Sequence, residues 1–281
     1  MGKNKFITNA MLEQYMIFLR TEEKSSATRE KYNRDILKFM HYLSGRTVTK
    51  EIVLEYKEYL KGIYMPTSVN SMLAAINSLF DYCGHVELKV KRLKIQRQMF
   101  CNEDKELSKE EYERLIFASK QKGQTRINLI IQAICGTGIR VSELEHITVE
   151  SVRDGKAVVD CKGKIRKVFF SDKLKKILLK YIREQQLETG SVFITKNGKP
   201  VNRSNIWREM KALCEEADVL PSKVFPHNLR HLFARTFYGM DKDISKLADI
   251  LGHSNVETTR GYIVSSGLEH YNQVNRIGFV L

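Results

Sequence analysis

Apolar residues recur at three- and four-residue intervals through most of the first hundred positions, a spacing typical of amphipathic helices. The stretch 28–43 shows the pattern most clearly, and the apolar side chains that share its buried face are Tyr32, Ile36, Phe39, Met40 and Leu43. Ser26 or Thr28 is positioned to cap its start, and Gly45 follows its end. The stretches 9–19, 49–60 and 66–82 have similar stripes, and Pro66 suits the first turn of a helix. We therefore predict a small domain of four or five helices.

The pattern becomes mixed after Leu107. Ser108 and Glu111 have the spacing of a capping box at the start of a helix. Two short β-like runs, 157–161 and 165–170, flank Lys162-Gly163-Lys164 and predict a hairpin. A short strand is expected at 191–195. Helices are expected at 126–135, from about Arg140, and at 173–185, 204–217, 226–238, 242–251 and 256–263. The sequence thus predicts a mainly α protein whose second domain is mixed α/β and mostly helical.

The segment 88–97 separates the two patterns because it is basic and lacks a helical stripe. Its cations are Lys89, Lys91, Arg92, Lys94 and Arg97, and it contains no acidic residue. We interpret it as the start of a connector that continues to about Lys105, with domains at 1–98 and 106–281 and the linker proper at 99–105. These cations are candidate contacts to a DNA backbone; an ordinary solvated linker is the alternative.

Charge strengthens the case for a polyanionic partner. The 281 residues include 47 Lys and Arg against 33 Asp and Glu, which gives a net charge of +14. The excess is spread over both predicted domains, and this distribution favours nucleic acid over a neutral enzyme with a basic tail. No apolar run approaches the ~20 residues of a membrane helix, so we expect no membrane contact and a cytoplasmic location. Five scattered cysteines predict reduced thiols.

Three local patterns bear candidate chemistry: GTGIRVSEL at 136–144, HNLRH at 227–231 and LGHSNVETTRGY at 251–262. Each has an ordinary alternative. Arg140 lies three residues before Glu143 and suits a local ion pair. His227 and His231 have a spacing found in metal sites, but neither a following Glu nor a third ligand accompanies them. Tyr262 alone suits packing better than chemistry.

Taken together, the patterns form an ordered set, and the chain resembles the tyrosine recombinases of the phage integrase and Xer group. The resemblance extends over nearly the whole chain. It implies a helical, SAM-like core-binding domain before a catalytic domain with a small β-hairpin. The catalytic residues that it implies are Arg140, Lys162, His227, Arg230, His253 and Tyr262.

These residue types suit phosphoryl transfer from a DNA diester. Arg140 and Arg230 remain protonated and can bind the non-bridging oxygens, where charge develops, and His253 can donate a further hydrogen bond. Tyr262 supplies the nucleophile, and its phenol must lose a proton during attack. His227 is a candidate base or proton relay. No cofactor is expected, and no acidic cluster suggests Mg²⁺.

The leaving 5′-oxygen needs a proton, and the hairpin lysine can supply it. We choose Lys162 because a small residue, Gly163, follows it as in the family, although the shorter turn leaves Lys164 as a competitor. Glu143 matches an acidic position that orients the cluster around the first arginine. His231 suits a supporting role on its helix.

Three-residue spacing recurs in the last stretch, at Leu268, Tyr271, Val274 and Ile277. Packing against its own domain is one reading. The resemblance favours a tail that docks on a neighbouring subunit in a tetramer on double-stranded DNA, as expected for integration, excision or resolution of a mobile element. Two alternatives stay open: DNA relaxation like that of a type IB topoisomerase, and a DNA-binding regulator without catalysis.

Overall fold

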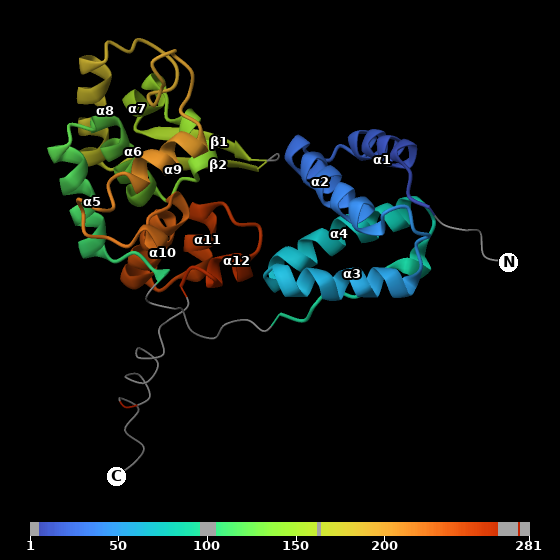
Figure 1. The fold of residues 1–281 in the computed structure, drawn as a ribbon. Helices are drawn as coiled ribbons and strands as arrows, with labels where there is room; N and C mark the ends of the chain where they lie inside the picture. Colours follow the sequence, from blue (N-terminus) through green and yellow to red (C-terminus); the bar gives the residue numbers. More distant parts are fainter. Residues whose placement is uncertain (1–5, 96–104, 162–163, 264–274, 276–281) are drawn as a thin grey trace. The chain divides into compact units, whose positions relative to one another are not determined.

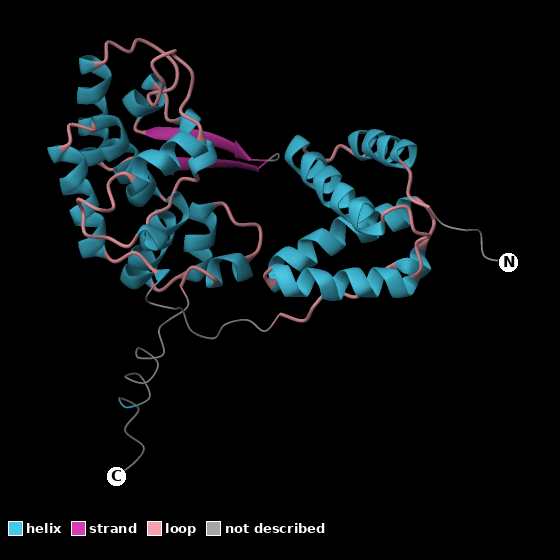
Figure 2. Cartoon of the chain, viewed as in Figure 1, coloured by secondary structure: helices cyan, strands magenta, loops and turns pink. Residues whose placement is uncertain are grey.

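The computed structural model describes residues 6–95, 105–161, 164–263 and 275, and the chain divides into two compact units, Met1–Arg97 and Gln98–Leu281 (Figure 1). Both units are built mainly from helices, and the described strands form one small antiparallel hairpin (Figure 2). The expected mainly α fold is therefore confirmed. Each unit has its own hydrophobic core.

The first unit consists of α1 (Asn9–Thr21), α2 (Ser26–Leu43), α3 (Lys50–Ile63), α4 (Pro66–Tyr82) and the short 3₁₀ helix η1 (Val86–Leu88). Helix α4 packs against α2 and α3, and its buried face includes Leu73, Ile76 and Phe80. The predicted helices are all present, with Pro66 in the first turn of α4. The cap of α2 was predicted wrongly: Ser25, one residue earlier, accepts the hydrogen bond from the Thr28 N–H.

The segment after α4 is docked on this unit, which corrects the interpretation of its first residues as the start of a connector. Leu88 and Val90 are buried in the core. Asn77 bonds both backbone groups of Val90, with an N–H to Oδ1 distance of 3.0 Å and an Nδ2 to carbonyl distance of 2.9 Å. Asn70 makes the same pair of bonds to Leu93. Two asparagines thus replace the strand partner that this extended backbone lacks.

The second unit follows a longer element order. Its helices are α5 (Lys109–Gln121), α6 (Thr125–Thr137), α7 (Val149–Asp154), α8 (Asp172–Glu184), α9 (Arg203–Lys211), α10 (Pro226–Asp241), α11 (Ile244–Leu251) and α12 (Val256–Arg260), with 3₁₀ turns η3 (Val141–His146) and η4 (Pro221–Lys223). The strands are β1 (Lys156–Cys161) and β2 (Lys164–Phe169).

Helix α6 occupies the centre of this unit because it is apolar on nearly every side. It packs against α5, α8, α9 and α10, and Ile127, Ile130, Ile131 and Ile134 are buried. The predicted capping box at the start of α5 is confirmed, with Ser108 and Glu111 each bonding the other's backbone N–H. The predicted hairpin is also confirmed, and its register pairs Cys161 with Lys164.

Several boundaries differ from the prediction. The helix expected from Arg140 is the 3₁₀ turn η3, and α9 ends at Lys211 because the following amides at Leu213 and Cys214 bond carbonyls three residues back. The strand expected at 191–195 is reduced to isolated bridges at Ser191 and Ile194. The partner of Ile194 is Pro200, which has no N–H with which to extend a ladder. Helix α7 was not predicted because it has fewer than two full turns.

Gly138 ends α6 in the left-handed region, with φ at 66°, and has no room for a side chain. A Cβ there would lie 2.5 Å from Cδ1 of Phe233. We expect Gly138→Ala to lower the free energy of unfolding by about 2–4 kcal/mol, from left-handed strain plus overpacking. Gly239→Ala is the matched control, since a Cβ at Gly239 meets nothing within 4 Å, and it should raise stability by about 0.5 kcal/mol.

Urea unfolding followed by the fluorescence of Trp207 measures both variants. Trp207 is the single tryptophan of the chain and lies in α9, so its signal reports on the second unit. Equal midpoints for the two variants would contradict the tight approach at Gly138.

Candidate active site

Arg230 lies at the centre of a group of candidate residues and is only 1% exposed. Its Nη1 donates to the Gly138 carbonyl at the end of α6, and its Nη2 donates to the Leu251 carbonyl at the end of α11 at 2.7 Å. Carbonyls at helix C-termini carry partial negative charge and suit a cation. Burial, and next the Arg140 charge, lower the pKa of Arg230 to about 10, so the guanidinium remains protonated at neutral pH.

Glu143 holds two further arginines beside this centre. One carboxylate oxygen accepts from Arg140 Nη1 at 2.8 Å, and the other accepts from the Arg140 backbone N–H at 2.9 Å and from Arg166 Nη2. Burial opposes the charge of Glu143, but these bonds and the two guanidinium charges hold the pKa of its carboxyl below the usual range. Glu143 therefore orients Arg140, in the position that the sequence predicts.

Arg166 was not predicted as a site residue. It lies in β2 and is almost buried, and its Nη1 donates to the Ile250 carbonyl in α11 at 2.8 Å. Gly252 leaves space for this side chain, since a Cβ there would lie 2.4 Å from Arg166 Cδ. Among several cations in the hairpin, the sequence offers no signal that separates Arg166 from the lysines.

His253 has a defined tautomer in this arrangement. Arg230 Nη2 lies 3.0 Å from His253 Nε2, and His253 Nδ1 lies 2.9 Å from Thr259 Oγ1. Because a guanidinium only donates, Nε2 is the acceptor and the proton lies on Nδ1. Burial, then Arg230, Arg140 and Arg166, lower the pKa of His253 to about 4. His253 is thus neutral, and its Nε2 accepts a hydrogen bond from Arg230 Nη2.

Tyr262 lies among three imidazole rings. Its ring centroid is 4.2 Å from that of His231, 5.1 Å from His253 and 5.3 Å from His227. The guanidinium carbon of Arg230 lies 5.9 Å from the same centroid. The structure therefore brings together six of the predicted site residues that it describes, namely Arg140, His227, Arg230, His231, His253 and Tyr262, together with the Glu143 that orients Arg140.

His227 and His231 interact with each other one turn apart on α10, where their Nε2 atoms are 3.1 Å apart. Burial lowers the pKa of His227 to about 4, and the charges of His231 and Arg230 act in the same direction. Glu106 is a second residue that the sequence analysis missed. Its carboxylate lies 3.5 Å from His231 Nδ1 and 2.9 Å from Arg235 Nη1. Nothing in the sequence links Glu106 to residues more than a hundred positions away.

Some predicted residues cannot be placed. Lys162, Arg97 and the apolar tail positions lie outside the described residues, the tail positions being Leu268, Tyr271, Val274 and Ile277. Of the other connector cations, Lys91, Arg92 and Lys94 are exposed, whereas Lys89 forms an ion pair with Asp81 at 2.7 Å.

Within the described ranges, no group of three or more His, Cys, Asp or Glu side chains has the geometry to hold a metal ion. In the same part of the chain, Cys83, Cys135 and Cys214 are free thiols. None of the helices described is both long and apolar enough to cross a bilayer.

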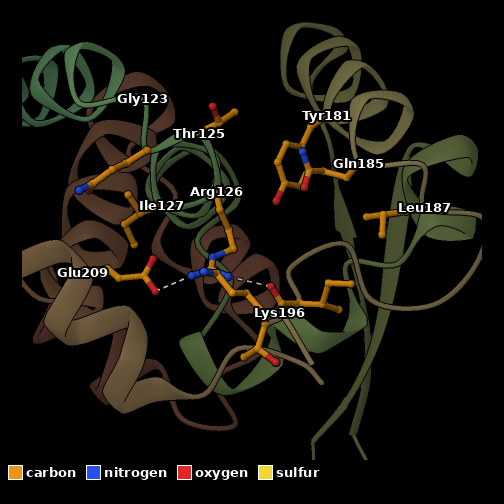
Figure 3. Close-up of a pocket in the computed structure, with 12 residues that line it drawn as sticks. Gly123, Thr125, Arg126, Ile127, Tyr181, Gln185, Leu187, Lys196 and Glu209 are labelled. Atoms are coloured by element: carbon orange, nitrogen blue, oxygen red, sulfur yellow. Dashed lines mark hydrogen bonds and ion pairs between the residues drawn. The ribbon is translucent and has the colours of Figure 1, made fainter. Parts of the chain in front are cut away.

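A separate hollow of about 650 Å³ in the second unit shares no lining residue with the group around Tyr262 (Figure 3). Arg126 projects into it, and its guanidinium donates to the Ile194 carbonyl at 2.9 Å and to Glu209 at 2.7 Å. The charges of Arg126 and Glu209 therefore neutralise each other, and we assign the hollow no part in the chemistry.

Family models and relatives of known name match most of the chain. Residues 105–267 match the model of the phage integrase family, and residues 12–85 match that of the phage integrase N-terminal SAM-like domain. Tyrosine recombinase XerA of Pyrococcus furiosus is 28% identical over 92% of this chain and 91% of its own length.

Two solved structures of similar fold are complexes with DNA. The XerH site-specific recombinase in a post-cleavage complex with palindromic difH matches with a TM-score of 0.75, 19% identity, and coverage of 95% of this chain and 84% of that one. A lambda integrase dimer on a COC′ core site matches with a TM-score of 0.74, 16% identity, and coverage of 92% and 78%. With both domain models matched in order, the chain belongs to the phage integrase family and is a tyrosine recombinase.

Proposed function

We propose that this chain cuts and rejoins double-stranded DNA at specific sites through a covalent 3′-phosphotyrosyl intermediate on Tyr262, without metal or ATP. The observation that carries the proposal is the position of the Tyr262 ring beside the buried guanidinium of Arg230 and among three imidazoles. A phenol there is close to the groups that bind a phosphate and accept a proton.

In the proposed reaction, Arg140 and Arg230 bind the non-bridging oxygens of the scissile phosphate. Charge spreads over those oxygens in the transition state, and fixed guanidiniums stabilise it without reorganisation. When the phosphate enters, its oxygen replaces His253 Nε2 as the acceptor for Arg230. His253 can then turn a donor toward the same oxygens after a change of tautomer.

The nucleophile must lose a proton during the reaction, whereas the leaving group must gain one. The Tyr262 oxygen attacks phosphorus as its proton passes to a base, and His227 is the candidate because its depressed pKa of about 4 keeps the ring neutral at physiological pH. The departing 5′-oxygen takes a proton from Lys162 at the hairpin turn. The phosphotyrosyl link retains the energy of the diester, so a second DNA end with a free 5′-hydroxyl can reverse the step.

The partner that we propose is a DNA recombination site bound by both units, 1–98 and 106–281, which are joined by the linker at 99–105. A net charge of +14 supports it, and Lys91, Arg92 and Lys94 are exposed for phosphate contacts. Four copies joined through the C-terminal tail would bring two sites together for integration, excision or resolution. The XerH and lambda integrase structures, both bound to DNA, support this proposal by similarity.

Tyr262→Phe should abolish covalent capture while it leaves DNA affinity within about threefold, because only the phenolic oxygen is lost. When the substrate is a duplex nicked near the scissile phosphate, cleavage releases the short fragment that carries the 5′-hydroxyl, so rejoining cannot occur. The covalent adduct therefore accumulates, and a denaturing gel separates it from free protein and DNA. The wild-type chain should form the adduct in the presence of a metal chelator. An adduct of equal yield in Tyr262→Phe would contradict the assignment, and DNA binding without any wild-type adduct would favour a regulator.

Lys162→Ala should slow cleavage of an ordinary diester by about 10²–10³-fold, since an unprotonated 5′-oxygen leaves poorly. A 5′-bridging phosphorothiolate needs no protonation and should restore the rate. Lys164→Ala is the control with the same loss of charge, two residues away in the hairpin. Rescue of Lys164→Ala rather than Lys162→Ala by the sulfur substrate would reassign the general acid.

A further inference from the structure

Glu106 lies three residues before the start of α5, far in sequence from every other group around Tyr262. We propose that Glu106 is a positioning residue: it holds His231 so that the His227–His231 pair accepts the Tyr262 proton and moves its charge away from the arginines. The inference rests on the proposed function, because it concerns the proton that Tyr262 loses during attack.

The contacts form a continuous chain of polar atoms. Glu106 Oε1 lies 3.5 Å from Nδ1 of His231, and the other ring nitrogen of His231 lies 3.1 Å from Nε2 of His227. A proton on His231 Nδ1 points at the carboxylate, which leaves Nε2 free to accept from His227. Both rings contact the Tyr262 ring, at centroid distances of 4.2 Å and 5.3 Å.

Electrostatics explains why a single histidine is a poor acceptor here. His227 faces the charges of Arg230 and Arg203, and its own pKa is depressed to about 4. A positive charge formed on His227 would add to the guanidiniums that hold the phosphate. Glu106 is the one group that acts on His227 in the opposite direction, and it contacts His231 directly. A charge moved to His231 therefore lies beside a carboxylate instead of an arginine.

The transfer balances as follows. The Tyr262 O–H bond breaks as the bond from its oxygen to phosphorus forms, and the proton passes to Nδ1 of His227. The Nε2 proton of His227 passes to Nε2 of His231, which becomes an imidazolium paired with Glu106. The bond from phosphorus to the 5′-oxygen breaks with its electron pair on that oxygen, which takes the lysine proton. Rejoining reverses each transfer.

A purely structural role for Glu106 is the alternative to be excluded. Its carboxylate also pairs with Arg235 of α10 at 2.9 Å, and Arg235 Nη2 donates to the Leu107 carbonyl at 2.6 Å. These contacts hold the start of the second unit against α10 whether or not a proton moves. A structural role predicts a loss of stability or DNA affinity, whereas the relay predicts a change in the pH dependence of cleavage.

The test is single-turnover cleavage of the nicked duplex at saturating DNA, with the 5′-bridging phosphorothiolate, as a function of pH. The sulfur leaving group removes the need for the lysine proton, so the rate reports on Tyr262 deprotonation. In wild type the rate should rise with pH as His227 loses its proton. Glu106 raises the pKa of His227, so Glu106→Gln should shift this rise to lower pH. Its plateau should fall about tenfold because the base is weaker.

Three variants sharpen the comparison. Glu113→Gln is the matched control, since Glu113 is an exposed carboxylate on α5 paired only at long range with Lys109, and it should cleave like wild type. Arg235→Gln removes the cation that competes for Glu106, so its rise should shift to higher pH. Once His231→Gln has broken the relay, adding Glu106→Gln should slow cleavage by less than twofold.

The outcomes separate the two proposals. Absence of a Tyr262 adduct in wild type would overturn the proposed function itself. A normal wild-type adduct with an unshifted pH profile and full plateau in Glu106→Gln, or a multiplicative loss in the double variant, would overturn the relay alone. If Glu106→Gln does not fold, Arg235→Gln decides: an upward shift supports the relay and an unchanged profile overturns it.

Discussion

The burial of one guanidinium constrains the whole catalytic unit. Arg230 is almost inaccessible to solvent and has no carboxylate partner among the residues that the structure describes, so its charge depends on the carbonyls of Gly138 and Leu251. Both carbonyls are available because α6 and α11 end there, each at a glycine in the left-handed region. The C-terminal ends of α6 and α11, which are far apart in the sequence, must therefore both contact the Arg230 side chain of α10. The requirement to satisfy Arg230 fixes where these three helices meet.

Glu143 extends the same constraint to the hairpin. It accepts from Arg140 at the start of η3 and from Arg166 in β2, and Arg166 in turn donates to the Ile250 carbonyl. A single buried carboxylate thereby fixes the first arginine and the strand that follows the hairpin turn relative to α11. Loss of such a group would leave buried charge uncompensated, a change that is strongly destabilising. Site geometry and stability of the fold thus depend on the same bonds.

The sequence predicted residue types and local elements well, but not the interactions between distant segments. Ser108 with Glu111, Pro66, and the hairpin around Gly163 are local signals whose chemistry lies within a few residues. Arg166 and Glu106 were missed because their importance comes from partners about 80 to 130 positions away. For the same reason the segment after α4 was taken for the start of a connector. Its backbone partners, Asn70 and Asn77, lie on a helix whose pattern shows only an apolar face.

The charge that remains in the described part of the site matches the proposed chemistry. Arg140, Arg166 and Arg230 are opposed by the carboxylate of Glu143, and His227 and His253 are neutral at physiological pH. The cluster therefore keeps an excess positive charge. A carboxylate partner for Arg230 would have cancelled part of that excess, whereas helix-end carbonyls stabilise the cation without cancelling its full charge. A phosphate diester gains negative charge on its non-bridging oxygens as the tyrosine attacks, so the excess acts most strongly in the transition state. Satisfying Arg230 with carbonyls thus keeps its charge available for catalysis.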